Sequence, residues 1–551
     1  MDGHRISIEG TLITSDYIHF TIDDHIHNET HSFTGSKSTI KCLPGDTVIW
    51  KDDICQLSKR IVHPPIVGTI ELTNKIKYGV TSRGYFKYLF VPYSLSYPQM
   101  VVGCSEKDLT CNKIGIAQFT SWSIDSQFPD ANLIRIIGNS GDILAEEDAI
   151  LQQYCPYKNK SIVPVDTTNE HSRKHLEGVT FNVDPPGCQD IDDVITVAQL
   201  STNKWCIVIT ISDVSSIIPG NSDIDNQAMR VGQTFYKDGI AIRPMLPASI
   251  SEYKCSLIPG KLRNGVSLEF VWDNNQKYIS NINWVLTTVI NNSSYTYEEF
   301  QNSEYAPLIN NISVFLEKGV CNDSHKWIES LMKFYNQEAG KLLKSAGHGI
   351  LRKHMPPDIE KLDKYINIRP ELAILAQSSA IYCNASDPDT GHYGLNTDAY
   401  CHITSPIRRY ADLFNQRILK KIIGVHDDTI VCTPDINTLN SRSRACKLFE
   451  RDLIYMRAVI GNESRTLNGT IIDIIEQAID TVSLPIYKIK IYVEEWRRII
   501  SCKYTKIEEG IIISKDCKTK KSIYESQKVH IQYAIHLIGR RWKDRIIFTI
   551  L

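Results

Sequence analysis

The sequence predicts a multidomain α/β protein in which small β-barrel domains flank a central α/β domain. Three observations support this prediction. Short β-prone runs fill about the first 160 residues, helical periodicity takes over after residue 320, and β-prone runs return after residue 463. A chain of 551 residues is also too long for one small domain, so we expect roughly three or four packed cores.

Composition and charge restrict the class of protein. Lys and Arg number 61 and Asp and Glu 63, so the net charge of −2 gives no whole-molecule sign of nucleic-acid binding, although a local patch could be basic. The fifteen cysteines form no CxxC pair and no zinc-ligand spacing with histidine, which predicts reduced thiols in an intracellular protein.

The N-terminus MDGHRISIEG is polar, and no stretch approaches the roughly 18 apolar residues that a membrane helix needs. We therefore expect no signal peptide and no membrane partner. The expected location is the cytoplasm, or alternatively the nucleus.

The N-terminal β-prone runs predict two small antiparallel barrels, because runs such as RISIEGTLI are short and are separated by turn residues. In TSRGYFKYLFVP, basic and aromatic residues alternate. Such a strand could stack the bases of a single-stranded nucleic acid, or it could supply an ordinary aromatic core face. The sequence leaves both interpretations open.

The central region begins with a predicted strand hairpin, in which VITVAQL and WCIVITISDV are joined by the turn STNK. Farther on, residues 326–346 repeat apolar side chains such as Trp327 and Leu331 at three- and four-residue steps. This spacing predicts an amphipathic helix whose aromatic residues belong to the core.

Two further helices are predicted at 370–383 and 406–423, because each segment begins with proline, which is favoured at the first helical position. Ser405 would cap the second helix and Gly424 would end it. The last segment returns to strands, and residues 485–551 hold 15 Lys and Arg against 7 Asp and Glu. This basic β-rich tail indicates nucleic-acid binding or, alternatively, a lysine-rich solvated surface.

The stretch DPPGCQDIDD places Asp184, Asp190, Asp192 and Asp193 within ten positions. Carboxylates this close repel one another unless a cation intervenes. Oxygen ligands without thiol or imidazole favour Mg²⁺ or Mn²⁺, and the spacing lacks the pattern of a calcium loop. A Pro-Pro-Gly corner could bring Asp184 back toward the other acids. The alternative is an acidic turn that only faces solvent.

Arg408 and Arg409 fall in the first turn of the predicted 406–423 helix, where free N–H groups favour an anion. An arginine there could bind a phosphate or stabilise charge in a transition state. The alternative is a structural Arg408–Asp412 pair along the helix. A metal site and an arginine-bearing helix start together favour phosphodiester chemistry.

These residues resemble the RNB family of exoribonucleases. VDPPGCQDIDD and HYGLNTDAYCHITSPIRRYADL carry the resemblance, and ISDVSSII, PMLPASISEYKCSLIPGKLRNGVSLEF, YTYEEF and LLKSAGHGILRKHMPP follow in the family's order. The first motif and the GHYGL run are most similar to the eukaryotic branch. The resemblance implies cold-shock-like OB domains at 1–66 and 67–165, an RNB catalytic domain at 166–462 and a C-terminal OB-fold domain at 463–551.

The resemblance also implies Mg²⁺-dependent hydrolysis of single-stranded RNA from its 3' end, with release of 5'-nucleoside monophosphates. The family's motif residues match the metal ligands Asp184, Asp190, Asp192 and Asp193, of which Asp192 and Asp193 are catalytic together with Arg408 at the scissile phosphate. The residues expected to contact RNA are Tyr236, which clamps the 3'-terminal nucleotide, together with Tyr297, Glu371 and Arg409.

The chain departs from the family pattern at Ile403 and at Gln416, where a histidine is usual. Because the first barrel is predicted to begin near residue 5, we expect no endonuclease domain like that of the exosome subunit, and we expect a monomeric exonuclease without stable exosome association. Two rival hypotheses remain. One is a catalytically inactive RNA-binding protein on the same scaffold, and the other is an unrelated metal-dependent phosphoesterase.

Overall fold

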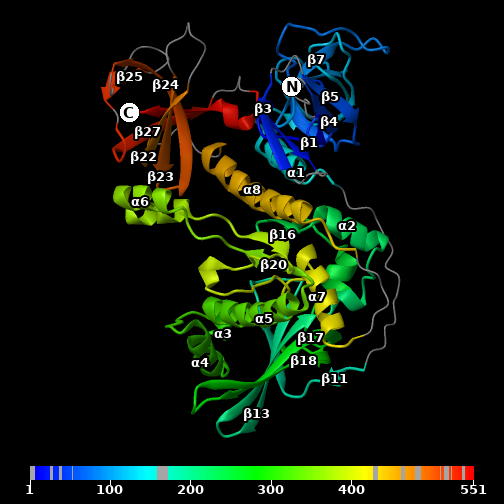
Figure 1. Cartoon of the computed structure of the whole chain (residues 1–551), viewed down its shortest axis with the longest axis vertical. Coiled ribbons are helices and arrows are strands. Elements are labelled where there is room, and N and C mark those ends of the chain that lie inside the picture. The colour runs from blue at the N-terminus through cyan, green and yellow to red at the C-terminus, as the bar shows by residue number, and fades with distance from the viewer. Residues whose placement is uncertain are drawn as a thin grey trace, which may run out of the picture. The chain divides into compact units, whose positions relative to one another are not determined.

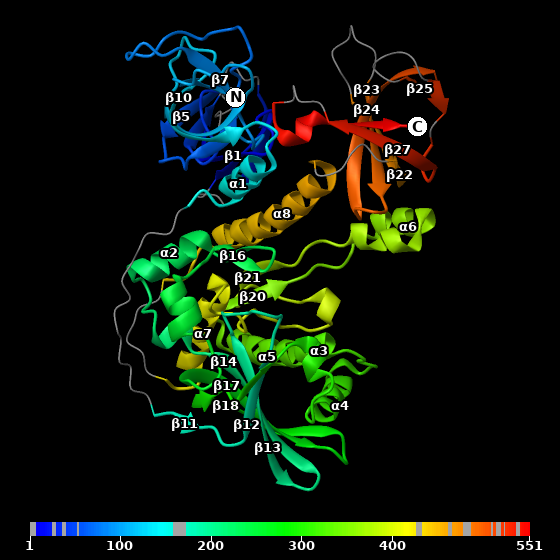
Figure 2. The same cartoon turned by 180° about the vertical axis from the view of Figure 1, so that it is seen from behind.

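The computed structural model describes residues 7–24, 29–35, 40–51, 54–157, 172–425, 432–460, 466–477, 486–508, 511–513, 520–522, 524–535 and 540–551. It divides into two compact units, one of Met1–Tyr157 with Leu448–Leu551 and the other of Lys158–Lys447. Figures 1 and 2 show the elements of both units from opposite sides.

The first module is a five-stranded antiparallel sheet of order β3-β2-β1-β4-β5. Its strands are β1 (Ile8–Thr14), β2 (His19–Asp24), β3 (Glu29–Thr34), β4 (Thr47–Lys51) and β5 (Ile54–Lys59). Leu12, Phe20 and Val48 are fully buried in its core, as the alternation of apolar residues along these strands requires.

The second module is a closed barrel of order β10-β8-β7-β6-β9, followed by helix α1 (Ile143–Tyr154). Its strands are β6 (Ile66–Ile70), β7 (Lys87–Pro92), β8 (Met100–Gly103), β9 (Lys113–Ser121) and β10 (Asp130–Asn139). The prediction of a small barrel is confirmed here. The barrel is not wholly antiparallel, because β8 and β10 close it as a parallel pair.

The aromatic run TSRGYFKYLFVP does not form a single exposed face. Strand β7 begins only at Lys87, and the rings of Tyr88 and Phe90 are buried inside the barrel. Tyr85 and Phe86 precede the strand and are exposed. The core interpretation therefore holds for the two rings in the strand, and only the preceding turn offers aromatic surface.

The second unit is built on a mixed seven-stranded sheet of order β11-β18-β17-β14-β13-β12-β19. Its strands are β11 (Lys174–His175), β12 (Val179–Val183), β13 (Asp193–Ser201), β14 (Lys204–Ser212), β17 (Leu262–Asp273), β18 (Tyr278–Ile290) and β19 (Ser293–Tyr295). Strands β13 and β14 form the predicted antiparallel hairpin, which is confirmed.

Helices α3 (Tyr297–Phe300), α4 (Ala306–Glu317) and α5 (Ser324–Ala346) pack on one face of this sheet (Figure 2). The predicted amphipathic helix is confirmed as α5. Its Leu331 and Tyr335 are fully buried against the sheet residues Leu268 and Phe270. This layer of helix on sheet is the main core of the unit.

The other elements of this unit are shorter than α5. They are η1 (Val214–Ser216), α2 (Asp223–Val231), β15 (Phe235–Lys237), β16 (Ile240–Arg243), η2 (Ser249–Lys254), β20 (Ile350–Lys353), α6 (Ile359–Ile368), η3 (Pro370–Ala376), β21 (Ile381–Asn384), η4 (Tyr393–Leu395) and α7 (Tyr410–Ile422). Helix α8 (Ile436–Ile460) runs from this unit into the other.

The helix predicted over 370–383 is only partly present. Pro370 does begin a helix, but it is the short 3₁₀ helix η3, and residues 381–384 form strand β21 instead. Strand β21 pairs with β20, and the Asn440 side chain from α8 bonds both the N–H and the carbonyl of Tyr382. These long-range bonds outweigh the local helical preference.

The helix predicted to begin at Pro406 begins instead at Tyr410, so the predicted cap at Ser405 is wrong. The Thr234 N–H donates to the Arg408 carbonyl, and the Tyr410 N–H donates to the Gly232 carbonyl. This bridge requires extended backbone at Arg409, whose φ and ψ are −133° and 127°, so residues 405–409 form a turn. Helix α7 does end just before Gly424, as predicted.

The C-terminal module is an antiparallel sheet of order β26-β25-β24-β23-β22-β27-β28. Its elements are β22 (Thr466–Gln477), β23 (Ile486–Val493), β24 (Arg498–Glu508), β25 (Ile511–Ile513), β26 (Lys520–Ser522), β27 (Lys528–Ile535), η5 (Trp542–Arg545) and β28 (Ile546–Ile550). Within its unit, Arg545 forms a buried 2.6 Å ion pair with Glu146 of α1. Nucleic-acid binding by this basic module stays a prediction.

Two predictions from the sequence can be compared with the described residues, namely that no helix spans a membrane and that the cysteines are reduced. No helix in these ranges is long and apolar enough to span a membrane. The fourteen cysteines that fall in the same ranges are all free thiols.

Gly340 of α5 permits close contact with the segment that leads into the 405–409 turn. A Cβ atom there would lie 3.1 Å from Tyr400 Cα and 3.2 Å from the Ala399 carbonyl. We predict that Gly340→Ala lowers the melting temperature by about 2 °C or more, because overpacking costs about 1–3 kcal/mol and exceeds the gain in helix propensity of about 1 kcal/mol.

The matched control is Gly319→Ala, whose Cβ would meet nothing closer than 3.7 Å. Thermal unfolding of the full chain, followed by circular dichroism, measures both variants. A melting temperature for Gly340→Ala equal to or above that of the wild type would contradict the prediction.

Candidate active site

The acidic segment is a turn between two paired strands. Asp184 directly follows β12 and Asp193 begins β13, and the two strands are antiparallel neighbours. Gly187 has a φ of +80°, which favours glycine, and the Cys188 N–H donates to the Pro185 carbonyl. The chain therefore reverses within the segment, as the Pro-Pro-Gly corner predicted.

The carboxylates of this turn lie within electrostatic range of one another. Burial raises the pKa of Asp192 to about 7, against the lowering effect of Arg408. Burial also raises the pKa of Asp184, and burial together with the charges of Asp184 and Asp192 raises that of Asp193. Because these folded-state values exceed the unfolded value of about 3.9, the acids destabilise the fold increasingly as pH rises from about 4 to 7.

Asp192 connects the acidic turn to the 405–409 turn. Its Oδ1 accepts the Ile407 N–H at 3.0 Å, and its Oδ2 accepts Arg408 Nε at 3.2 Å. The side chain of Asp192 is 3% exposed and that of Arg408 48% exposed, so the pair runs from the interior to the surface. The two motifs that the sequence analysis identified separately thus meet in one contact.

Arg409 is held by a different acid. Its Nε and Nη2 donate to the two carboxylate oxygens of Asp412 at 3.0 and 2.7 Å, and Asp412 Oδ1 also accepts the Ser405 N–H. The structural pair considered in the sequence analysis therefore exists, but it contains Arg409 and not Arg408. Contact of Arg409 with RNA stays a prediction.

Tyr236 of β15 contacts the acidic turn. Its hydroxyl donates to Asp190 Oδ2 at 2.5 Å, and burial together with the Asp190 charge raises the pKa of the phenol. Tyr236 is thus brought to the site, and it orients one of the predicted metal ligands.

Tyr297, the first residue of α3, lies within electrostatic range of two of the acids. Burial, and then the charges of Asp184 and Asp193, raise its pKa to about 12. Its ring stacks on His325, with 3.8 Å between ring centroids. Glu371 lies on η3, and its exposed carboxylate pairs with Arg369 at 3.4 Å. The position of Glu371 gives no support to its predicted role, which remains a prediction.

A buried polar network beneath the site was missed by the sequence analysis. Gln416 of α7 donates to the Ser212 carbonyl and accepts the Ser215 N–H. Lys420, one turn later, donates to both oxygens of Asp213 at 3.0 Å. The signal was the spacing of Asp412, Gln416 and Lys420 at every fourth position, which puts three polar side chains on one helix face.

Whether a divalent cation fits here can be judged from the carboxylates of the acidic turn, which would be its ligands. Among the described residues, no group of three or more His, Cys, Asp or Glu side chains is arranged closely enough to hold an ion. Asp192 and Asp190 are turned instead toward Arg408 and Tyr236. The donor chemistry nevertheless fits, because the charges of Asp184, Asp190, Asp192 and Asp193 all interact with that of Arg408, and hard oxygen donors suit Mg²⁺.

Sequence comparison identifies this region. Residues 173–307 and 309–424 match the family profile of the RNB domain. The central region of this chain is an RNB domain. Residues 87–155 match the Dis3-like cold-shock domain 2 (CSD2), which covers part of the closed barrel and α1. The resemblance and the predicted fold class, an RNB domain with cold-shock and OB-like domains, are confirmed; the exact domain boundaries stay a prediction.

Curated relatives of the RNB domain extend the match. The Exosome complex exonuclease RRP44 of Mus musculus is 24% identical over 493 residues, covering 71% of this chain and 50% of that protein. Exoribonuclease 2 of Buchnera aphidicola is 26% identical over 445 residues, covering 64% of this chain and 68% of that protein. The chain thus spans about half the length of the RRP44 relatives.

Solved structures share the fold. RNase R of Mycoplasma genitalium, in complex with ribose methylated single-stranded RNA, matches with a TM-score of 0.75 at 19% identity, covering 99% of this chain and 100% of that chain. Yeast Ssd1, a pseudonuclease, matches with a TM-score of 0.64 at 17% identity, covering 96% and 81%. A nuclease and a pseudonuclease therefore share this architecture, so the fold does not distinguish activity from its absence.

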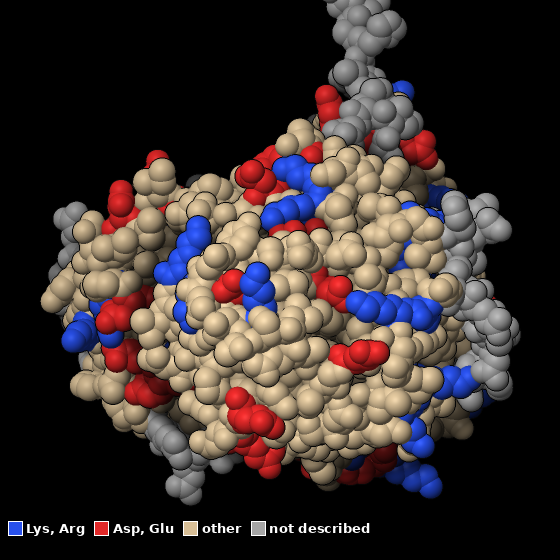
Figure 3. All heavy atoms as spheres, turned by 90° about the horizontal axis from the view of Figure 1, so that it is seen from below, with Lys and Arg blue, Asp and Glu red and all other residues tan. Residues whose placement is uncertain are grey.

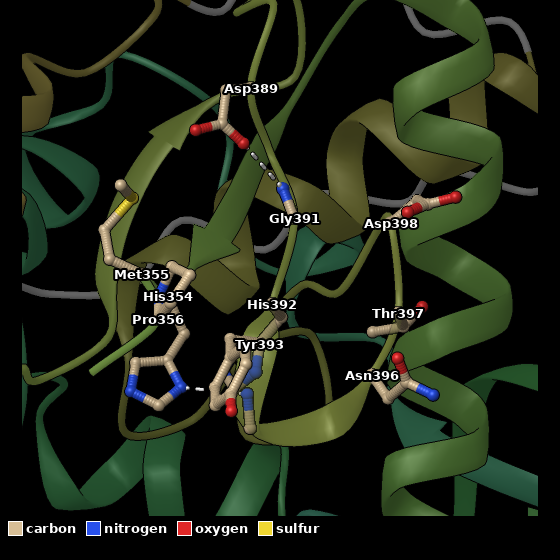
Figure 4. Close-up of a pocket in the computed structure, with 11 residues that line it drawn as sticks. His354, Met355, Pro356, Asp389, Gly391, His392, Tyr393, Asn396, Thr397 and Asp398 are labelled. Atoms are coloured by element: carbon tan, nitrogen blue, oxygen red, sulfur yellow. Dashed lines mark hydrogen bonds between the residues drawn. The ribbon is translucent and has the colours of Figure 1, made fainter. Parts of the chain in front are cut away.

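The RNB domain also has an open pocket of about 1120 Å³, which Figure 4 shows in close-up. It is lined by residues 354–356 and by parts of 389–398, and no predicted site residue lies among them. His354 Nε2 bonds the Ser378 carbonyl, and its Nδ1 accepts the Gly394 N–H. Both ring nitrogens are thus used within the fold, so His354 is a structural residue that holds the GHYGL segment, residues 391–395, through Gly394.

Surface charge does not mark a nucleic-acid path on the face shown in Figure 3. There, Lys and Arg are interspersed with Asp and Glu, and no field of one sign covers that face. This agrees with the net charge of −2.

We predict that Asp412→Asn destabilises the RNB domain by about 1.5–3 kcal/mol, because it leaves the partly buried Arg409 guanidinium without the counter-charge of the fully buried Asp412. The double variant Arg409→Gln with Asp412→Asn should recover part of this loss, since it removes both charges. Denaturant unfolding followed by fluorescence measures the effect.

The matched control is Asp363→Asn, which changes an exposed acid of α6 and should alter stability by less than about 0.5 kcal/mol. Equal stability of Asp412→Asn and the control would show that the Arg409–Asp412 pair is not needed.

Proposed function

We propose that this chain is a hydrolytic 3'-5' exoribonuclease that degrades single-stranded RNA and releases 5'-nucleoside monophosphates. The relatives named as exoribonucleases support RNA degradation. The single observation that supports catalysis most strongly is the Asp192 contact, which places the acidic turn and Arg408 at one point. Metal-assisted hydrolysis of a phosphodiester uses an acidic metal site, and a cationic side chain beside it can stabilise the charge that develops on the phosphate.

The proposed metal ligands are Asp184, Asp190, Asp192 and Asp193, and the proposed ion is Mg²⁺, with Mn²⁺ as a substitute. When bound, the ion would supply Lewis-acid activation of water and neutralise charge on the phosphate. The carboxylates of the chain bring hard oxygen donors whose mutual repulsion a cation relieves.

Arg408 is the proposed phosphate-binding residue. The nearby acids raise the pKa of its guanidinium further above its usual value, so the charge is permanent. About half of the side chain, 48%, is exposed and can receive a phosphate oxygen, while Asp192 and Ser405 hold the other edge. A fixed, charged donor of this kind stabilises the charge that develops on the phosphate in the transition state.

Tyr236 and Tyr297 are the proposed contacts of the 3'-terminal nucleotide. They reach the acids from separate elements, β15 and α3. RNA is the proposed substrate because ribose 2'-hydroxyls offer additional hydrogen bonds, and single strands are proposed because their bases can stack on aromatic side chains.

An inactive RNA-binding protein on the same fold remains the alternative, since Ssd1 shares the architecture. Loss of the acids would favour it, but this chain retains Asp184, Asp190, Asp192 and Asp193. Their retention supports the catalytic proposal.

The direct test uses 3'-labelled and 5'-labelled single-stranded RNA with Mg²⁺. We predict that the 3' label appears at once as a mononucleotide, whereas the 5'-labelled strand shortens progressively. Asp192→Asn should reduce cleavage at least about 100-fold, because losing several kcal/mol of charge stabilisation costs tenfold for each 1.4 kcal/mol.

The asparagine keeps an oxygen that can accept the Ile407 N–H, so RNA binding should stay within about threefold of the wild type. Asp223→Asn, an exposed acid at the start of α2, is the control. Undiminished cleavage by Asp192→Asn would refute the assignment, and removal of divalent ions by EDTA should abolish cleavage by the wild type.

Metal binding can be tested without RNA. We predict that Tyr236→Phe weakens Mn²⁺ binding about tenfold, because the ring remains but Asp190 loses the hydroxyl that orients it. Electron paramagnetic resonance titration of the full chain with Mn²⁺ measures the affinity. Tyr253→Phe, which changes an exposed tyrosine of η2, is the matched control, and equal affinities for the two variants would contradict the prediction.

A further inference from the structure

Tyr297 has an aromatic neighbour that its motif does not reveal. The rings of Tyr297 and His325 are nearly parallel, with 3.8 Å between centroids and 12° between planes. His325 lies in the first turn of α5, 28 positions away, and its side chain is 61% exposed. The imidazole therefore covers one face of the Tyr297 ring and itself faces solvent.

Next to this stack, the first residues of α3 pack against the first residues of α5 (Figure 2). The Ser324 hydroxyl, which is buried, donates to the Tyr297 carbonyl at 2.7 Å. About one helical turn farther along each helix, the buried rings of Phe300 and Trp327 pack edge to face, with 6.3 Å between their centroids. The backbone under both stacked rings is thus fixed by contacts that do not involve either ring.

His325 is oriented by its own helix cap. The Asp323 carboxylate accepts the His325 N–H at 2.7 Å and lies 3.3 Å from the imidazole Nδ1. Both side chains of this pair are half exposed or more, so solvent weakens their attraction. The stack on Tyr297, and not the contact with Asp323, is therefore the main restraint on the His325 ring.

We propose that His325 is a positioning residue of the RNB domain, which stacks on Tyr297 and holds the phenol beside Asp184 and Asp193. The inference rests on the proposed function. Glu371, by contrast, is exposed on η3 and pairs with Arg369. Because His325 covers one face of the Tyr297 ring, that face is not available to stack on a base.

A ring that is held in one plane aligns the terminal nucleotide for reaction, and a displacement of about 1 Å in an active site can cost about 100-fold in rate. Removal of the imidazole should therefore reduce kcat more than it changes KM. A flat, apolar ring at position 325 should restore the stack, because stacking does not require the imidazole nitrogens.

The kinetic test compares His325→Ala with His325→Phe on single-stranded RNA. We expect kcat to fall at least about tenfold in His325→Ala with KM within about threefold, and kcat to recover to within about threefold of the wild type in His325→Phe. The control is His348→Ala, an exposed histidine just beyond the other end of α5, which should leave both constants unchanged. An active wild type with unchanged kcat in His325→Ala would overturn the proposal.

A second measurement does not depend on cleavage. In full-length protein labelled at histidine Cε1, the resonance that disappears in His325→Phe should be shifted upfield by the Tyr297 ring and should move downfield in Tyr297→Leu. An unshifted resonance would overturn the stack and the proposal with it.

A third measurement separates this inference from the proposed function. In the Asp192→Asn background, RNA with 2-aminopurine as its 3'-terminal base should change fluorescence on binding, and His325→Ala should alter that change while His348→Ala does not. Equal signals for both variants would overturn the proposal even if the wild type were inactive. An inactive wild type with a signal that depends on His325 would refute only the proposed nuclease activity.

Discussion

The contact of Asp192 with the 405–409 turn is the interaction on which the rest of the site depends. It joins backbone and side-chain donors to a carboxylate more than 200 positions earlier in the chain, and the carboxylate is almost completely buried. A buried carboxylate without donors would be strongly unfavourable, so the Ile407 N–H and the Arg408 guanidinium must stay in place for the fold to hold. The same contact brings a permanent positive charge to four acids.

The 405–409 turn keeps its shape because helix α7 supports it with polar groups. Asp412, Gln416 and Lys420 lie on one face of this helix and bond the turn, the end of β14 and Asp213. Burial raises the pKa of the Asp213 carboxyl, but the charges of Lys420 and Arg173 outweigh burial and bring this pKa below its usual value. Each buried charge has a partner, and removing one partner would leave the other uncompensated. Through Ser405, the network holds the turn that carries Arg408, which the proposed role of Arg408 at the phosphate requires.

Elements with strong local periodicity could be predicted from the sequence, and those set by distant partners could not. The β13–β14 hairpin and helix α5 follow from alternation and from three- and four-residue spacing. The start of α7 was misplaced because the strand-like bridge between Arg409 and Gln233 prevents helix formation there. Residues 381–384 became a strand because β20 and the Asn440 side chain supply bonds that a helix would not use.

The sequence by itself determined the family, the acidic cluster and the arginine motif, because these depend on which residue types occur in which order. Only the tertiary structure decided which arginine meets which acid: Arg408 bonds Asp192, and Arg409 bonds Asp412. It also decided that His325 lies against Tyr297, whereas Glu371 pairs with Arg369. The physical reason is that such contacts join side chains from separate elements, and their geometry comes from packing, on which local sequence patterns carry no information.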